Sequence, residues 1–178
     1  MKLLNVGSSD VYHLPPMYAD YEEVRLDIDE KAQPDILMDA RDMQYVDAFD
    51  AVYCSHMLEH LIERDIHQVL RNFWNALVPG GSVTIIVPNL KKVFGDILYY
   101  GRDLNDVLYL AGKNEVRGVD ILYGFQQFVA EDDRGIYWQH RYGFTPKHLE
   151  RFLIAHEFEE VVVMTQDYDM LGTGRKPE

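Results

Sequence analysis

The sequence contains a single cysteine, Cys54, in 178 residues, so a framework of internal disulfides is excluded. Such low cysteine usage fits a reducing compartment, and we predict a cytoplasmic protein. The sequence also lacks an apolar run long enough to form a transmembrane helix. Its N-terminus turns polar too soon for a secretory signal peptide. We therefore expect a soluble protein that does not act at a membrane.

Basic residues are scarce: the chain has 17 lysines and arginines but 30 acidic residues, and its formal net charge is −13. A field of this sign repels phosphate backbones, so we expect no nucleic-acid partner. Repeats of fixed period and low-complexity tracts are absent as well. Hydrophobic residues make up 47% of the chain, which is ample for one core. The length and composition predict a single domain spanning residues 1–178.

Strand and helix patterns alternate through the first ninety residues. Short apolar, β-branched runs predict strands, and apolar residues at helical spacing predict a helix over 62–77 that Pro79-Gly80-Gly81 ends. This alternation favours a Rossmann-like α/β three-layer sandwich with a mostly parallel sheet. Counting a C-terminal antiparallel hairpin, we expect seven strands, over residues 2–6, 23–29, 35–39, 49–54, 82–88, 159–165 and 168–174.

Residues 89–140 break this alternation. The stretch is rich in Tyr, Leu, Asp and Gly and is mainly helical where it has a pattern. We interpret it as an insertion over the substrate side of the sheet, and as the surface of a homodimer if one forms. After it, Thr145 and Pro146 predict the start of a helix that runs to about residue 156. Core packing is the favoured use of the insertion's tyrosines, with ring stacking on a substrate or a dimer interface as alternatives: Tyr99, Tyr100, Tyr109, Tyr123 and Tyr137.

Three features follow predicted strands in order. Gly7, Ser8 and Ser9 follow the first strand, where small residues allow a ligand to approach the backbone. Asp27, with Asp29 as a close rival, ends the second strand and could accept from both ribose hydroxyls. Asp39 follows the third strand and could accept from an adenine amine. Each alone is a common turn feature, but the carboxyl ends of parallel strands share one edge of a sheet, where ligands bind.

These segments resemble class I methyltransferases dependent on S-adenosylmethionine (SAM). Residues 2–9 resemble the first motif of that superfamily, and residues 39–42 resemble its adenine-contacting turn. Residues 49–61, with Leu58-Glu59-His60-Leu61, resemble the fourth-strand motif of its small-molecule branch, and Pro79-Gly80-Gly81 follows at the family's distance. Residues 144–161 and 171–177 resemble its late helix and closing strands. The resemblance implies SAM as cofactor and methyl transfer to a small-molecule acceptor, with a sugar or cell-surface precursor as one candidate.

The resemblance also implies roles for individual residues. Gly7, Ser8 and Ser9 would line the methionine and ribose end of SAM, and Asp27 would hold the ribose hydroxyls. Asp39 and Ala40 would meet adenine, whereas Cys54, Ser55 and His56 would flank the methionine part and the substrate. The chain departs from the family where Ser8-Ser9 replace glycines and Asn5 stands near an acidic position. The alternative is therefore a methyltransferase-like binding or regulatory subunit that has lost catalysis.

A general base would assist transfer to an oxygen acceptor, and histidine is suited to that role. His56, just beyond the fourth strand, and His140, just after the insertion, are the candidate catalytic residues, with His60 a third option that could equally cap and pack its helix. We expect no metal site, because histidines and acidic residues show no close ligand spacing beyond His56 and His60. The missing G-x-G-x-x-G argues against a dinucleotide enzyme.

Overall fold

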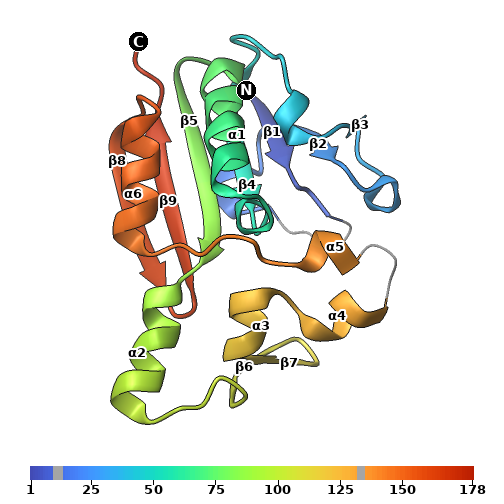
Figure 1. Cartoon of the computed structure of the whole chain (residues 1–178). Coiled ribbons are helices and arrows are strands. Elements are labelled where there is room, and N and C mark those ends of the chain that lie inside the picture. Colours follow the sequence, from blue (N-terminus) through green and yellow to red (C-terminus); the bar gives the residue numbers. More distant parts are fainter. Residues whose placement is uncertain (10–13, 132–134) are drawn as a thin grey trace.

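The computed structural model describes residues 1–9, 14–131 and 135–178. Residues 132–134 of the predicted insertion thus lie outside the described part. A seven-stranded sheet organises the rest, in the order β3-β2-β1-β4-β5-β9-β8 (Figure 1). Its first five strands are parallel, and β9 runs antiparallel to both β5 and β8. The predicted Rossmann-like sheet with a C-terminal hairpin is confirmed, its strands being β1 (Lys2–Val6), β2 (Glu22–Asp27), β3 (Ile36–Leu37), β4 (Phe49–Ser55), β5 (Leu77–Pro88), β8 (Glu159–Gln166) and β9 (Asp169–Arg175).

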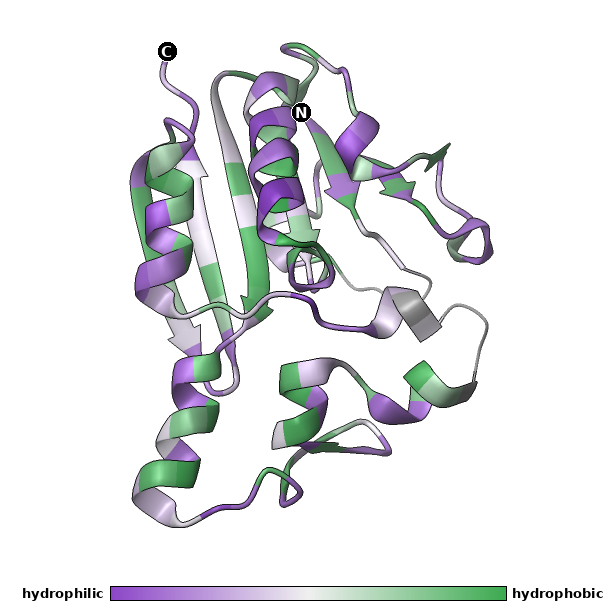
Figure 2. Cartoon of the chain, viewed as in Figure 1, coloured by the Kyte–Doolittle hydropathy of each residue, from purple (hydrophilic) through white to green (hydrophobic). Residues whose placement is uncertain are grey.

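Two helices, α1 (Glu63–Ala76) and α6 (Pro146–Ala155), cover the same face of the sheet (Figure 1). Ile66 and Phe73 of α1 and Leu149 of α6 are fully buried in the main core. Figure 2 shows hydrophilic residues on the outward side of α1 and hydrophobic ones in the strands behind it. Each helix thus buries one apolar stripe, as the spacing predicted.

The opposite face of the sheet carries a thinner cover. In the described part of the β1–β2 connection, the helical structure is the short η1 (Pro16–Tyr18). Tyr18 is buried there against Leu3, Ala51 and Tyr53. On this face of the sheet, the side chain of Tyr18 in the loop thus supplies packing that a covering helix would otherwise supply.

The Pro79-Gly80-Gly81 segment lies within β5, which begins at Leu77 directly after α1. The register with β4 shifts between the pairs Phe49–Leu77 and Ala51–Ser82, so the three residues form a bulge together with Val78. A Cβ on Gly81 would lie 2.8 Å from the carbonyl oxygen of Val78, which explains the glycine. We predicted a turn that ends the helix, and the helix does end there, but the strand starts five residues earlier than expected.

The insertion forms a small unit below the carboxyl edge of the sheet (Figure 1). Its own core contains Val93, Val116 and Ile121. A β-hairpin interrupts its helices, which the pattern did not predict. The elements are α2 (Leu90–Tyr100), β6 (Val107–Ala111), β7 (Asn114–Arg117), α3 (Gly118–Tyr123), α4 (Gln126–Glu131) and α5 (Gly135–Trp138).

The expectation that the insertion's tyrosines pack in a core is wrong. Tyr99 is 83% exposed and Tyr100 is 78% exposed, and Tyr109, Tyr123 and Tyr137 are exposed as well. Tyr99, Tyr100 and Tyr123 lie at the ends of short helices, where a helical repeat does not imply a buried face, and Tyr109 lies within β6. Within the described ranges, no helix combines the length and the apolarity that crossing a bilayer requires.

Candidate functional site

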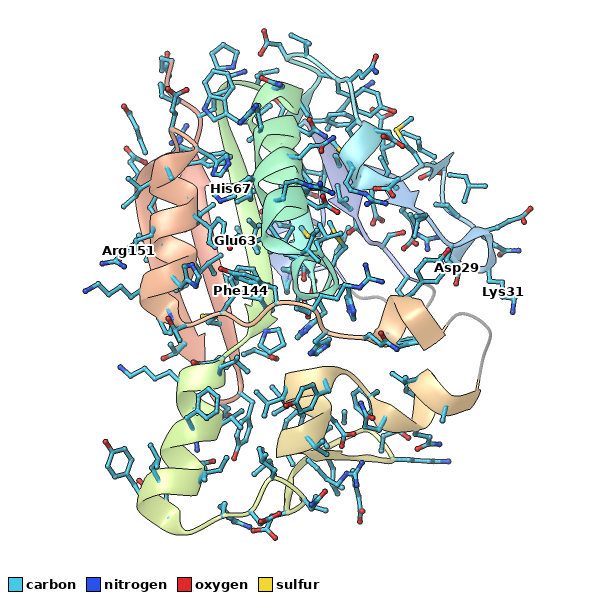
Figure 3. All side chains as sticks on the ribbon, viewed as in Figure 1. Asp29, Lys31, Glu63, His67, Phe144 and Arg151 are labelled. Atoms are coloured by element: carbon cyan, nitrogen blue, oxygen red, sulfur yellow. The ribbon has the colours of Figure 1, made fainter. Side chains whose placement is uncertain are left out.

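A cavity of about 600 Å³ lies at the carboxyl ends of β1, β2 and β4. Its walls come from those strand ends, from η2 (Glu30–Ala32) and η3 (Ala40–Asp42), and from α5 of the insertion. Figure 3 shows Asp29 and Lys31 on the turn that follows β2, on the side of the molecule away from α6. The cavity has the volume and the place in the fold of a small-molecule site.

Gly7 forms the turn at the end of β1 and lines the cavity. Its φ of 71° lies in the left-handed region, and an added Cβ would stand 2.7 Å from Cβ of Met57. The Gly7 N–H donates to the carbonyl of Leu26 at 2.9 Å, which ties the turn to β2. Glycine is thus required for both backbone conformation and space.

Asp27 ends β2 beside this turn and is 9% exposed. Its Oδ2 accepts from the backbone N–H of Ser9 at 2.9 Å, and its Oδ1 accepts from that of Asp29 at 2.8 Å. A carboxylate offers about four lone-pair sites. One site on each oxygen therefore remains for two hydroxyl donors in the cavity.

Asp39 caps η3 and accepts from the backbone N–H of Arg41 at 2.9 Å. The Arg41 guanidinium lies 2.6 Å from Oδ2 of Asp39 and 3.0 Å from Oδ2 of Asp65. The hydrogen bond from Arg41 lowers the pKa of Asp39, against the opposing effect of burial. Asp39 therefore lines the cavity as a carboxylate that already has a cationic partner, and buried Ala40 lies beside it.

Three residues expected to contact the cofactor do not line the cavity. Ser8 is 1% exposed, and its hydroxyl is buried with no hydrogen-bond partner among the described residues. Cys54 is fully buried in the core against α1, and this burial raises the pKa of its thiol. Ser55 is half-buried at the end of β4 outside the cavity wall. Alternation along β4 explains the position of Cys54, whose side chain faces the side of the sheet that α1 covers.

His56 lines the cavity with a φ of 51°. Its Nδ1 lies 3.2 Å from Oε1 of Glu59, and its Nε2 lies 3.7 Å from Oδ1 of Asp169. Burial lowers the pKa of His56, but the neighbouring carboxylates of Asp169 and Glu59 outweigh it and raise the pKa to about 10. The imidazole is then protonated at neutral pH and has no lone pair with which to accept a proton, as a general base must.

His140 does not line the cavity but lies behind it, beside His60, with the ring centroids 4.9 Å apart. Its Nδ1 donates to the carbonyl of Ile121 at 2.8 Å, and burial lowers the pKa of His140. His60 does line the cavity, and its Nδ1 donates to the carbonyl of Gln139 at 3.1 Å. The two histidines are thus held by the insertion and by the segment that leaves it.

Sequence reasoning did not single out several residues of the cavity wall. Arg41, Asp65 and Arg141 contribute charge, and Trp138 of α5 contributes an exposed aromatic ring beside Tyr137, for which stacking on a substrate was an alternative. Trp138 packs against Phe128 with centroids 5.1 Å apart. These side chains converge from distant segments, and no local pattern in the sequence marks them.

Residues 4–85 match a family model described as methyltransferase domain. No curated protein matches the sequence. Among solved structures, a SAM-dependent methyltransferase from Archaeoglobus fulgidus aligns with a TM-score of 0.64 at 14% identity, over 98% of this chain and 86% of that one. These matches confirm the resemblance seen in the sequence.

Two further structures share the fold. A 1,6-didemethyltoxoflavin-N1-methyltransferase from Burkholderia thailandensis, with 1,6-didemethyltoxoflavin and S-adenosylhomocysteine bound, has a TM-score of 0.59 at 14% identity, over 99% of this chain and 71% of that one. A possible exported protein from Bordetella parapertussis has a TM-score of 0.60 at 14% identity. The alignment covers 99% of this chain and 62% of the Bordetella chain. At such identities, these likenesses establish the fold.

Proposed function

We propose that this chain, a member of the class I SAM-dependent methyltransferase superfamily, binds SAM in the cavity and transfers its methyl group to a small-molecule acceptor. The hydrogen bonding of the Asp27 carboxylate is the observation that carries the proposal. Its nearly buried carboxylate keeps one acceptor site on each oxygen facing the cavity, as two adjacent ribose hydroxyls require. Gly7 lies beside it in a turn that no larger residue fits.

The rest of the cavity also fits a nucleoside. Ile28, Met38 and Leu61 supply apolar side chains on its wall, which suit the faces of an adenine ring. Asp39 and Ala40 lie at the same end, on η3. Asp39 can accept from the adenine amine only if its carboxylate binds the amine and Arg41 together, or if its ion pair with Arg41 breaks. Ser8, Cys54 and Ser55 would support this site through the backbone of the strand ends rather than through cofactor contacts.

When bound, SAM supplies an electrophilic methyl group on a sulfonium, so the protein mainly has to position the acceptor. His56 lies on the cavity wall at the end of β4, and its protonated imidazole would donate to the acceptor through Nε2, in place of the longer contact with Asp169. Tyr137 and Trp138 would cover the acceptor side and reduce the access of water. His140 would act on the acceptor only through its neighbour His60.

A small-molecule acceptor is supported by two observations. The net charge of −13 disfavours a polyanionic nucleic acid. The Burkholderia relative is a methyltransferase that binds a small molecule. A sugar or cell-surface precursor as the acceptor, a cytoplasmic location and a homodimer through residues 89–140 stay predictions.

Calorimetric titration with SAM and with S-adenosylhomocysteine tests the proposal. We expect micromolar binding to the unaltered protein and a loss of about tenfold to 100-fold in Asp27→Asn, which removes charge and one acceptor oxygen. Asp42→Asn is the matched control, because Asp42 is an exposed carboxylate outside the cavity wall. Asp42→Asn is expected to bind as the unaltered protein does.

A folded protein that fails to bind either ligand at millimolar concentration contradicts the proposal. That result would favour the alternative of a binding or regulatory subunit that has lost catalysis. Two features of the site motivate the alternative: Ser9 occupies a left-handed conformation with φ 52°, and Arg41 already holds the Asp39 carboxylate.

A further inference from the structure

We propose that Glu59, His60 and His140 bind a divalent transition-metal ion, of the class of Zn²⁺, at the inner wall of the cavity. The spacing of ligand types along the chain predicted no metal, since His140 follows His60 by eighty residues. The fold nevertheless brings one ligand atom from each of the three residues within 4.8 Å of the others. Two imidazoles and one carboxylate form a recurrent ligand set for zinc and for related divalent metals.

In both imidazoles, a backbone carbonyl holds Nδ1. Nδ1 of His60 bonds to the carbonyl of Gln139, and Nδ1 of His140 bonds to the carbonyl of Ile121. A carbonyl oxygen only accepts, so Nδ1 carries the hydrogen in each ring and Nε2 keeps the lone pair. Metal-binding histidines characteristically fix their second nitrogen in this way, with a backbone carbonyl or a carboxylate.

Glu59 supplies the second, independent observation. Its side chain is 1% exposed, and Oε1 accepts from Nδ1 of His56. Oε2 is buried and has no hydrogen-bond partner among the described residues. Leaving a carboxylate oxygen buried without a partner is costly, and a cation satisfies it. The hydrogen bond from His56 would at the same time hold the carboxylate in place as a ligand.

Backbone hydrogen bonds bring His140 to this place. The N–H groups of Arg141 and Tyr142 both donate to the carbonyl of Glu59, at 2.7 and 3.1 Å. The N–H of His140 donates to the carbonyl of Tyr123 at 3.3 Å. The chain leaving the insertion is thus fastened to η4 (Leu58–His60) on one side and to α3 on the other.

The ligand atoms lie within 4.8 Å of one another, an outer limit that exceeds their spacing around a bound ion. Bonds of about 2.1 Å in a tetrahedral site place ligand atoms about 3.4 Å apart. Rotation of the three side chains would have to bring the ligand atoms to this spacing when an ion binds. Since His60 also lines the cofactor cavity, an acceptor oxygen could occupy a free coordination position there. That last role rests on the proposed methyl transfer, whereas metal binding itself does not.

Titration of the chelator-treated protein with Co²⁺, followed by displacement with Zn²⁺, tests the inference. We expect one Co²⁺ per chain, with the visible absorption of a four- or five-coordinate ion, and its loss when Zn²⁺ is added. Glu59→Gln and His140→Gln should each weaken the binding by about 100-fold or more. His156→Gln is the matched control, because Nε2 of His156 lies 3.3 Å from Nδ1 of His67, in a histidine pair away from the cavity. It should bind Co²⁺ as the unaltered protein does.

Thermal melting and SAM titration of each variant accompany the metal titration. A variant that melts cooperatively and has lost Co²⁺ supports the proposal, whether or not it binds SAM. Absence of saturable Co²⁺ binding by the unaltered protein overturns it, as does Co²⁺ binding in both site variants with the affinity of the unaltered protein. Failure of SAM binding with metal binding intact would instead count against the proposed function alone.

Discussion

The hydroxyl of Tyr18 lies 2.7 Å from Oγ1 of Thr84, in a hydrogen bond buried between the β1–β2 connection and the central strand β5. Tyr18 also makes edge contacts with Tyr21 and Tyr53, at centroid distances of 5.3 and 5.9 Å. This contact fastens the loop that begins with the Gly7 turn onto the sheet. We therefore expect the position of the Gly7 turn, which lines the cavity, to depend on the packing of Tyr18 on the sheet face opposite α1 and α6.

Tyr18→Phe is expected to destabilise the protein by about 1–3 kcal/mol, because it leaves the buried hydroxyl of Thr84 without its partner. Thr84→Val should cost a similar amount, and the double variant should cost less than the sum. Urea unfolding of all four proteins gives the coupling free energy. Strictly additive losses would mean that the hydrogen bond contributes nothing.

Gly7→Ala is expected to weaken SAM binding and to lower the free energy of unfolding by about 2–4 kcal/mol, the sum of left-handed strain and overpacking against Met57. Gly112→Ala is the matched control, because Gly112 has a φ of 62° and no atom within 4 Å of an added Cβ. It should show the backbone strain alone, about 1–2 kcal/mol. Equal losses of unfolding free energy in the two variants would show that the Met57 side chain moves aside without a cost in stability.

Lys176→Met is expected to destabilise the protein by about 2–4 kcal/mol. The buried ammonium lies 2.7 Å from both Oδ1 of Asp47 and the carbonyl of Leu77, and 4.2 Å from the ring centroid of Trp74. Removing it leaves the buried carbonyl without this donor. Chemical unfolding measures the loss, with exposed Lys147→Met as the control, for which we expect little change. A Lys176→Met protein as stable as the unaltered one would contradict this account.

Asp120 connects the insertion's elements, since its carboxylate accepts from the backbone N–H groups of Arg117 and Gln126 and from the Arg117 guanidinium. Burial raises the pKa of Asp120, but the hydrogen bonds from Arg117 and Gln126 outweigh it and lower the pKa. A group whose pKa is lower in the folded state stabilises that state fully above its unfolded pKa, near 3.8. The contribution is lost as pH falls through the lower, folded pKa.

Asp120→Asn should therefore speed hydrogen exchange in β7 and α3 by about tenfold at neutral pH. The difference from the unaltered protein should shrink as the pH falls below the unfolded pKa. Hydrogen exchange measured by mass spectrometry over a pH series checks this. A difference that stays constant down to low pH would show that the charge of Asp120 is not responsible.

Much of the fold could be read from local patterns. The β-branched run over residues 82–88 and the apolar spacing of Ile66, Val69 and Phe73 each depend on a few neighbouring residues, and both appear as predicted. The strand-end positions of Gly7, Asp27 and Asp39 followed from the same patterns, because parallel strands end at a common edge. The structure places all three on one cavity.

Other features depended on contacts between distant segments. The exposure of Tyr99 and Tyr100, the bulge in β5 and the ion pair of Arg41 with Asp65 have no local signal.

The sequence by itself determined the order of strands and helices outside the insertion, the turn that only Gly7 fits and the carboxylate that ends β2, because hydrophobic periodicity and backbone sterics act over a few residues. Only the tertiary structure decided that His140 lies beside Glu59 and His60. Nothing near His140 in the sequence specifies that contact. It arises because the chain leaving the insertion hydrogen-bonds to the carbonyl of Glu59, some eighty residues earlier.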